Sequence, residues 1–498
     1  MTRNIVAGWV AQFVQIIGGF ILPHLIDKHL TTRQLGVWDF AWTVVAYFSL
    51  LQGGLVSSVN RYVAKFHSKG DLAGLNQAVS SSTMLLRGVG LGILLVTGIC
   101  VACVPHFMKD SLRDFTTEIQ WMILVLGLSN AITVSASCYA GILTGCHRWD
   151  LNSSVLMAQN VVSLLISAGL LLLGYGLVAL AVAQLIIEAA GRSARAVFAY
   201  RVCPGLSIRW RHFHWDQAKE MIGFGGKSLI SQLSSLFLNQ TVNMLITPYF
   251  GLTVLAHYNR PVKLIQNLTA FMQRYAMVFT PAISSMQAAG NTEAVIELTL
   301  NSVRYSAFVC LPLLLTLGIS GAGVMTLWMG PDYADGLLVA AVVLAFAPTV
   351  VYMPLTQVLM GLNLHGRSSM ANLVTSIIGV VGVWIDLRIF HGGLISLAAV
   401  LGVSMFLSSG IYLPIYTCRQ LKVPFLHFLD SVWRMPVLCS LPYVASLLVA
   451  RFFFPGSPIR SLLVGGSVGG VLLISCYWVW VVPTPMKQKL ARKLGFSK

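Results

Sequence analysis

The sequence predicts an all-α polytopic membrane protein, and three observations lead to this fold class. Charged residues make up 10% of the 498 residues and hydrophobic residues 56%, whereas roughly a quarter of an ordinary soluble domain is charged. Apolar segments of about 20 residues recur along the whole chain, and each could cross a hydrocarbon core of roughly 30 Å as a helix. Basic residues are abundant in alternate loops and sparse in the others.

About fourteen transmembrane helices are expected from these apolar segments. Their approximate bounds are 4–27, 36–60, 77–104, 117–144, 151–174, 177–199, 218–247, 252–284, 300–328, 334–361, 368–388, 393–417, 426–450 and 460–483. The first segment contains Asn4, Gln12 and Gln15 and has no small-residue cleavage site. We therefore expect it to belong to the mature fold rather than to act as a signal peptide.

The formal net charge of +17 follows from membrane topology. Nineteen Lys and Arg residues fall in the tails, the loops and the adjoining helix ends on the side of the N-terminus, and seven fall on the opposite side. Because basic loops stay in the cytoplasm, this distribution predicts that both termini are cytoplasmic. The excess positive charge suits contact with anionic membrane lipids, and no nucleic-acid partner is needed to explain it.

The nine cysteines are scattered and mostly intramembrane, which argues against a disulfide framework. Cys100 and Cys103 form the only CxxC motif, at the outer end of an apolar helix and without a second ligand pair. We interpret them as small residues that pack between helices. No metal site and no other cofactor are expected.

An internal repeat divides the chain. A shift of 220 residues superimposes similar residues in the first two helices of each of two six-helix sets, and six helices per set give both sets the same membrane orientation. The superimposed pairs are Gln12 and Gln232, Asp39 and Asn259, and Gly70 and Gly290. The predicted parts are an N-terminal lobe 1–199, a basic cytoplasmic linker 200–217, a C-terminal lobe 218–417, and two additional helices with a basic tail, 418–498. Substrate is expected between the two lobes.

Seven cations lie inside predicted spans, where each costs on the order of 2.5–3.5 kcal/mol unless a cavity, a partner or snorkelling compensates. They are Arg87, Lys227, Arg260, Lys263, Arg274, Arg304 and Arg434. Glu188 is the one acid well inside a span. Arg192 follows it by one turn and favours a structural ion pair; an unpaired Glu188 would be the natural group for coupling to a proton or sodium gradient.

The eighth predicted helix carries the clearest polar face. At about 100° per residue, Arg260, Lys263, Asn267 and Arg274 fall within roughly 60° of one another. Helix packing could explain a polar face of amides and hydroxyls. Three cations on one face repel each other, however, and no acidic face answers them. An anionic substrate, in particular a phosphate or pyrophosphate, fits this arrangement better.

Other polar faces are weaker signals. Lys227, Ser231 and Gln232 lie on the polar side of the seventh helix, and Gln12 lies on that of the first. Packing and sugar binding both remain open for them.

For three further cations, snorkelling or a local ion pair could explain the charge inside a span without a substrate. Arg87 and Arg304 each lie in the third helix of a bundle near the cytoplasmic side, where snorkelling and substrate contact are both open. Arg434 follows Asp430 by four residues, which favours a local ion pair.

Catalytic motifs do not stand out. The run from Gly225 to Ser228 resembles part of a P-loop, but Met221 replaces the first glycine and no strand precedes it. HExxH and DxD-type motifs are absent from the sequence. We therefore do not expect an enzyme; a membrane-embedded polymerase or glycosyltransferase would need acidic or histidine catalytic groups.

Short segments near the N-terminus carry a family resemblance. They are Gly18-Gly19-Phe20-Ile21-Leu22-Pro23, Gln34-Leu35-Gly36-Val37-Trp38, Gly53-Gly54-Leu55, Arg61-Tyr62-Val63-Ala64 and Lys69-Gly70-Asp71. With these segments, the fourteen-span plan and the two lobes, the chain resembles the polysaccharide transporter branch of the multidrug/oligosaccharidyl-lipid/polysaccharide exporter superfamily. This branch contains bacterial flippases for O-antigen, capsule and exopolysaccharide precursors.

The resemblance implies alternating access around a central cavity lined by the first, second, seventh and eighth helices. The implied cargo is an undecaprenyl-diphosphate-linked oligosaccharide, carried from the inner to the outer leaflet of the bacterial cytoplasmic membrane. Diphosphate and sugar contact carries over to Lys227, Arg260, Lys263 and Arg274, with Arg87 and Arg304 as secondary candidates. A polysaccharide polymerase and its co-polymerase are candidate partners.

Two transporters of the same superfamily are alternatives. Flippases for the lipid-linked peptidoglycan precursor also have a cationic cavity, but the resemblance implies more cations on their first two helices than this chain has. A multidrug or cation antiporter would need an acidic coupling residue and a cavity that attracts cations. The excess of buried Lys and Arg over Asp and Glu argues against it.

Overall fold

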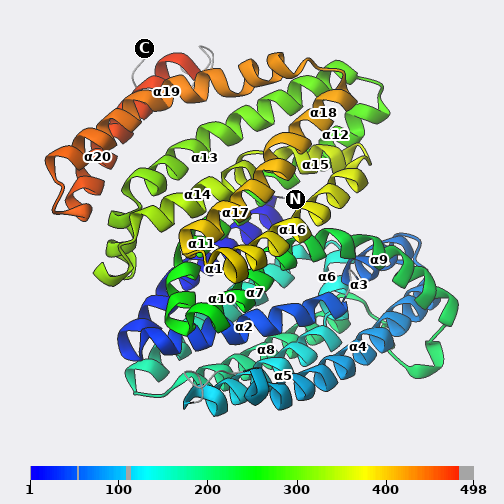
Figure 1. The fold of residues 1–498 in the computed structure, drawn as a ribbon. Helices are drawn as coiled ribbons and strands as arrows, with labels where there is room; N and C mark the ends of the chain where they lie inside the picture. Colours follow the sequence, from blue (N-terminus) through cyan, green and yellow to red (C-terminus); the bar gives the residue numbers. More distant parts are fainter. Residues whose placement is uncertain (1, 53–54, 108–113, 482–498) are drawn as a thin grey trace, which may run out of the picture. The chain divides into compact units, whose positions relative to one another are not determined.

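The computed structural model describes residues 2–52, 55–107 and 114–481, and all regular elements in these ranges are helices (Figure 1). The chain forms two compact units, residues 1–259 and 260–498. The predicted lobes, 1–199 and 218–417, are defined by the repeat rather than by compactness, and their boundaries stay a prediction.

The first unit is built from ten α-helices with short connecting turns. These are α1 (Thr2–His29), α2 (Thr32–Gln52), α3 (Leu55–Ser68), α4 (Leu72–Phe107), α5 (Thr116–Ser135), α6 (Cys138–Gly145), α7 (Trp149–Leu172), α8 (Leu177–Val202), α9 (Trp215–Leu236) and α10 (Val242–Phe250). A 3-10 turn, Trp210–His212, precedes α9, and a π-helical turn, Phe237–Thr241, joins α9 to α10. Helix α5 packs on α4 and α8, and α7 packs on α1 and α8.

The second unit begins within α11 (Leu252–Met277). It continues with α12 (Phe279–Ala288), α13 (Thr292–Trp328), α14 (Gly336–Val351), α15 (Met353–Gly361), α16 (His365–Ile385), α17 (Leu394–Met405), α18 (Leu413–Leu421), α19 (Phe425–Phe453) and α20 (Pro458–Cys476). Helix α13 packs against α14, α19 and α20, and α17 packs against α14 and α16.

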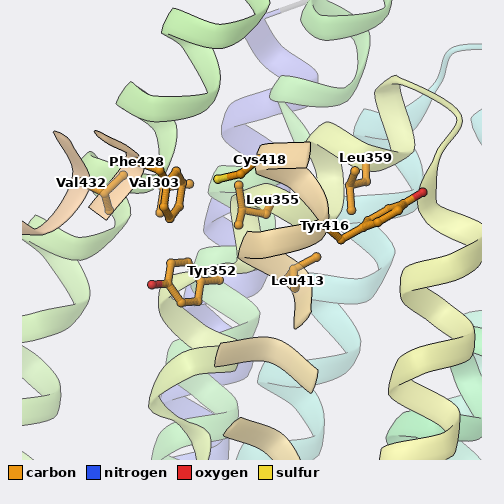
Figure 2. Close-up of a cluster of buried hydrophobic side chains, with 9 residues drawn as sticks. All are labelled: Val303, Tyr352, Leu355, Leu359, Leu413, Tyr416, Cys418, Phe428 and Val432. Atoms are coloured by element: carbon orange, nitrogen blue, oxygen red, sulfur yellow. The ribbon is translucent and has the colours of Figure 1, made fainter. Parts of the chain in front are cut away.

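The two C-terminal helices are docked on the second unit rather than loosely attached. Phe428 and Val432 of α19 enter a buried cluster with side chains of α13, α15 and α18 (Figure 2). Beside it, the Trp433 indole Nε1 donates a hydrogen bond of 2.8 Å to the Tyr352 hydroxyl. A half-buried tryptophan with its polar atom hydrogen-bonded stabilises such a contact at both its apolar and polar ends.

Ten helical segments among the described residues are long and apolar enough to cross a membrane. The other four predicted spans correspond to α1, α2 with α3, α9 with α10, and α11 with α12. Helix α11 misses that apolarity because Arg260, Lys263 and Asn267 interrupt it. The prediction of about fourteen spans is therefore consistent with the structure.

The backbone repeats the same turns in both units, which supports the internal repeat. Residues with positive φ occur in four matched pairs, separated by 220 residues in the first pair and by 216 or 217 in the others. The pairs are Gly70 and Gly290, His147 and Asn363, Gly174 and His391, and Gly205 and Lys422. Helices α4 and α13, of 36 and 37 residues, start directly after the first pair of turns.

A close helix contact is repeated as well. A Cβ atom on Gly145 would lie 2.7 Å from Val63 Cγ1, and one on Gly361 would lie 3.0 Å from Ile283 Cβ. These residues correspond under the same offsets, so α3 approaches α6 as α12 approaches α15. Glycine is needed at both positions because any side chain would overlap the facing helix.

The segment between α8 and α9 is hydrogen-bonded along the start of α4. The Asn76 side chain donates to the Gly205 carbonyl at 3.1 Å and accepts from the Ser207 amide at 2.8 Å. The His214 amide donates to Ser81 Oγ at 2.9 Å. This part of the predicted linker is therefore fixed to the first unit by its backbone.

Candidate anion-binding site

The polar face of α11 carries the candidate site, and we call Arg260, Lys263, Asn267 and Arg274 the α11 stripe. Arg260 is 1% exposed and is the largest fully buried side chain among the described residues. Lys263 is exposed, while Asn267 and Arg274 are half-buried. Helix α11 contains no Asp or Glu that could neutralise them.

Arg260 is the fully buried cation of the α11 stripe. Removing a guanidinium from water is costly, so Arg260 must be stabilised by polar groups. Arg260, Lys263 and Arg274 all have interaction partners in the structure. The stripe therefore contains one deeply buried cation and others nearer the surface. An anion that binds there can replace its hydrating water with hydrogen bonds from charged side chains.

Several predicted site residues lie on described backbone but outside the described side chains. These are Gln12 in α1 and Lys227, Ser231 and Gln232 in α9. Their assignment to the substrate site stays a prediction.

Other polar groups of the predicted second and seventh spans hydrogen-bond to each other. The Tyr47 hydroxyl lies 2.6 Å from Thr241 Oγ1, and Asn243 Nδ2 donates to Thr43 Oγ1 at 3.1 Å. Both contacts join α2 to the region of α10 within the first unit. At these positions the helix-packing interpretation is sufficient.

Arg87 lies beside a cavity of about 490 Å³ in the first unit. The cavity is bounded by α4 and by the region of α5 and α6, with Leu91, Leu94 and Leu128 among its apolar walls and Tyr139 among its polar groups. Arg87 is itself exposed. A cation next to apolar walls could meet an anionic group that is attached to a hydrocarbon chain.

Arg304 is engaged by the second unit. Its Nε donates to the Ser431 carbonyl of α19 at 2.5 Å, and its Nη1 donates to Asn301 Oδ1 at 3.4 Å. These bonds hold the guanidinium between α13 and α19, and they account for its position without a substrate.

The expected local ion pairs form. Arg192 Nη2 lies 3.3 Å from Glu188 Oε2, and Thr133 Oγ1 donates to the same carboxylate oxygen at 3.5 Å. Arg434 Nη1 lies 3.8 Å from Asp430 Oδ1 at an exposed position. Glu188 is therefore a paired acid in this state of the protein.

Two features of the structure were not predicted from the sequence. Arg195, near the end of the predicted span 177–199, is 4% exposed and donates from Nε to Asn152 Oδ1 at 2.9 Å. His67, Cys146 and Cys203 also come together in the first unit. Both features join residues distant in sequence, so neither periodicity nor motif spacing signals them.

A family model described as polysaccharide biosynthesis protein matches residues 91–337. A comparison of the sequence with curated proteins returns no match.

Three solved structures show the shared fold. The chain is similar to the lipid II flippase MurJ in an inward closed conformation, with 11% identity, a TM-score of 0.73, and coverage of 96% of this chain and 100% of that one. An inward-facing multidrug resistance transporter of the MATE family gives 15% identity, a TM-score of 0.66 and coverage of 84% and 94%.

A further similar structure is a MOP superfamily transporter from Pyrococcus furiosus, described by the reverse polarity of its binding pocket. It gives 15% identity, a TM-score of 0.62 and coverage of 84% and 95%. At such identities these likenesses show the fold alone. Together with the family model they confirm the resemblance found in the sequence: this multi-pass membrane protein is similar to the polysaccharide biosynthesis protein family over residues 91–337 and shares the fold of these solved transporters.

Proposed function

We propose that the protein is a flippase for an undecaprenyl-diphosphate-linked oligosaccharide, such as a repeat unit of O-antigen, capsule or exopolysaccharide. It moves this cargo from the inner to the outer leaflet of the bacterial cytoplasmic membrane by alternating access, with both termini in the cytoplasm. The observation that carries the proposal is the α11 stripe, which places three cations and an amide on one face of a helix without an acid.

The chemistry of the stripe suits a diphosphate. Arg260 and Arg274 can each present two parallel N–H donors to phosphate oxygens, and Lys263 adds a compact point charge. Asn267 can donate to and accept from sugar hydroxyls. The apolar walls beside Arg87 support a cargo that combines an anion with a hydrocarbon chain. Lys227, Gln12, Gln232 and Ser231 are proposed further contacts.

A flippase for the lipid-linked peptidoglycan precursor is the second candidate, favoured by the likeness to MurJ across 96% of the chain. The two cargoes share the lipid diphosphate and differ in the sugar and peptide. An antiporter is less well supported because Glu188 already pairs with Arg192. Coupling to a proton or sodium gradient, and assembly with a polymerase and co-polymerase, remain part of this proposal.

The test replaces Arg260, Lys263 and Arg274 singly by alanine in the native host. Each lost charge-assisted contact is worth about 1.5–3 kcal/mol, which corresponds to roughly tenfold to hundredfold weaker binding of the diphosphate. Surface glycan should fall and lipid-linked oligosaccharide should accumulate on the inner leaflet. Immunoblots of membranes confirm equal protein levels.

Arg434→Ala is the matched control, because this arginine is exposed and its ion pair is local. It should leave surface glycan unchanged. Normal glycan at normal protein level in all three α11 variants would overturn the proposed site. A lethal defect in cell-wall synthesis with intact surface glycan would favour the peptidoglycan precursor instead.

A further inference from the structure

Two cysteines and a histidine converge at one end of the first unit. Cys146 follows the last residue of α6, Cys203 follows the last residue of α8, and His67 lies in the last turn of α3. Their ligand atoms all lie within 4.8 Å of one another. The two sulfur atoms are 2.9 Å apart. Both cysteines are buried, whereas His67 is exposed.

Glycine packing brings His67 and Cys146 together. Gly141 and Gly145 of α6 face Val59 and Val63 of α3, and a Cβ atom on either glycine would come within 2.8 Å of a valine side chain. The next residue along α3 at this four-residue spacing is His67, which therefore reaches the end of α6. The convergence thus follows from a close helix contact that also holds the backbone in place.

The cysteine backbones are anchored independently of the cluster. The Cys146 amide donates to the Ile142 carbonyl at 2.9 Å, and the Cys203 amide donates to the Ala199 carbonyl at 3.0 Å. Both residues end helices, so their positions are set by α6 and α8. The exposed imidazole of His67 can turn about its side-chain bonds with little resistance.

The two thiols are hydrogen-bonded to each other. A hydrogen bond from Cys146 lowers the pKa of Cys203, and the same bond, with burial, raises the pKa of Cys146. The thiolate is the form in which a cysteine binds a metal ion. The separation of 2.9 Å exceeds a disulfide bond length of about 2.05 Å. The cluster also lies on the face proposed to be cytoplasmic, where thiols stay reduced.

We propose that His67, Cys146 and Cys203 bind a zinc ion. At Zn–S and Zn–N lengths of about 2.3 and 2.0–2.1 Å, tetrahedral ligand atoms lie roughly 3.6–3.8 Å apart. The two sulfur atoms need to separate by less than 1 Å on this scale, and the exposed imidazole moves inward. Both cysteines bind as thiolates, so their thiol protons are released to solvent. A fourth position stays open for water or another ligand.

The ion ties three segments of the first unit together. It joins the end of α3, the turn between α6 and α7, and the end of α8, where the chain continues into the segment held along α4. Zinc would therefore stabilise this end of the first unit. The corresponding positions of the second unit are Gln287, Leu362 and Gln420, which cannot form the same site.

The experiment measures zinc in the purified full-length protein by elemental analysis, with cobalt as a spectroscopic substitute. We expect about one zinc per chain and thiolate-to-cobalt charge-transfer absorption. Cys146→Ser and Cys203→Ser should abolish both signals. His67→Ala keeps both thiols and alters an exposed residue, so it should fold normally; the loss of a ligand should weaken zinc at least about tenfold.

The matched control is the double variant Cys100→Ser, Cys103→Ser, which removes two half-buried thiols of α4 that are not part of the cluster. It should retain zinc and the cobalt absorption. The proposal is overturned if the folded His67→Ala protein binds zinc as tightly as the original protein. It is also overturned if mass spectrometry after thiol alkylation shows Cys146 and Cys203 joined by a disulfide.

Discussion

Helices α2 and α11 occupy equivalent places in the internal repeat but carry different side chains. Both start at positions 220 residues apart, Thr32 and Leu252. In α2 the residues that correspond to Arg260, Lys263 and Asn267 are neutral: Phe40, Thr43 and Tyr47. Thr43 and Tyr47 hydrogen-bond to the region of α10.

The difference between the side chains of α2 and α11 shows that equivalent helices of the repeat have different roles. The same backbone position serves helix packing in the first unit and presents charge in the second. The repeat therefore supplies the geometry, and divergence at a few side chains supplies the chemistry.

The largest expected effect comes from giving α11 the side chains of α2. In Arg260→Phe combined with Lys263→Thr, two charge-assisted contacts are lost, so binding of the lipid diphosphate should fall by about a hundredfold or more. Surface glycan and the lipid-linked precursor pool report the loss. Arg434→Ala serves again as control. Glycan above half of the normal amount would show that charge on α11 is not what separates the two helices in function.

The repeated glycine contacts should be equally sensitive in both units. Gly145→Ala and Gly361→Ala each force an added Cβ atom into a facing helix, an overpacking that costs about 1–3 kcal/mol. Thermal unfolding in detergent, followed by loss of monomeric protein on size exclusion, measures the effect. Gly98→Ala is the control because no atom lies within 4 Å of its added Cβ. A stability loss at only one of the two glycines would contradict an equivalent packing role.

The zinc proposal can be tested by copying it to the second unit. The triple variant Gln287→His, Leu362→Cys, Gln420→Cys places the same donors at the corresponding turns, so zinc content should rise from about one to about two ions per chain. Elemental analysis of the folded protein measures it. A content that stays at one would mean that equivalent turns do not position these ligands equivalently.

The smallest effect is expected at Glu188. Glu188→Gln leaves the side chain in place and removes the ion pair with Arg192, so surface glycan should change by less than about twofold. Export of cationic dyes should be unchanged. A complete loss of transport at normal protein level would instead identify this acid as a coupling group.

Local patterns were predictable and long-range contacts were not. The α11 stripe and the pairs Glu188–Arg192 and Asp430–Arg434 all follow from the 3.6-residue period of a helix. The repeat was detectable from a few matched residues because a nearly constant offset in sequence relates its two copies. Contacts such as Tyr47 with Thr241, or Cys146 with Cys203, depend on how closely two helices approach. Helical periodicity within one segment does not show that approach.

Helices α4 and α13 are longer than is needed to cross the membrane. At 1.5 Å per residue, helices of 36 and 37 residues measure roughly 55 Å, well beyond a hydrocarbon layer of about 30 Å. Polar residues occur near their N-terminal ends, with Asn76 and Ser80 in α4 and Glu293 and Glu297 in α13. Each helix therefore begins as a stalk outside the bilayer. The exposed turns at Gly70 and Gly290 are natural places for inserting an epitope or a protease site while the membrane-embedded part stays intact.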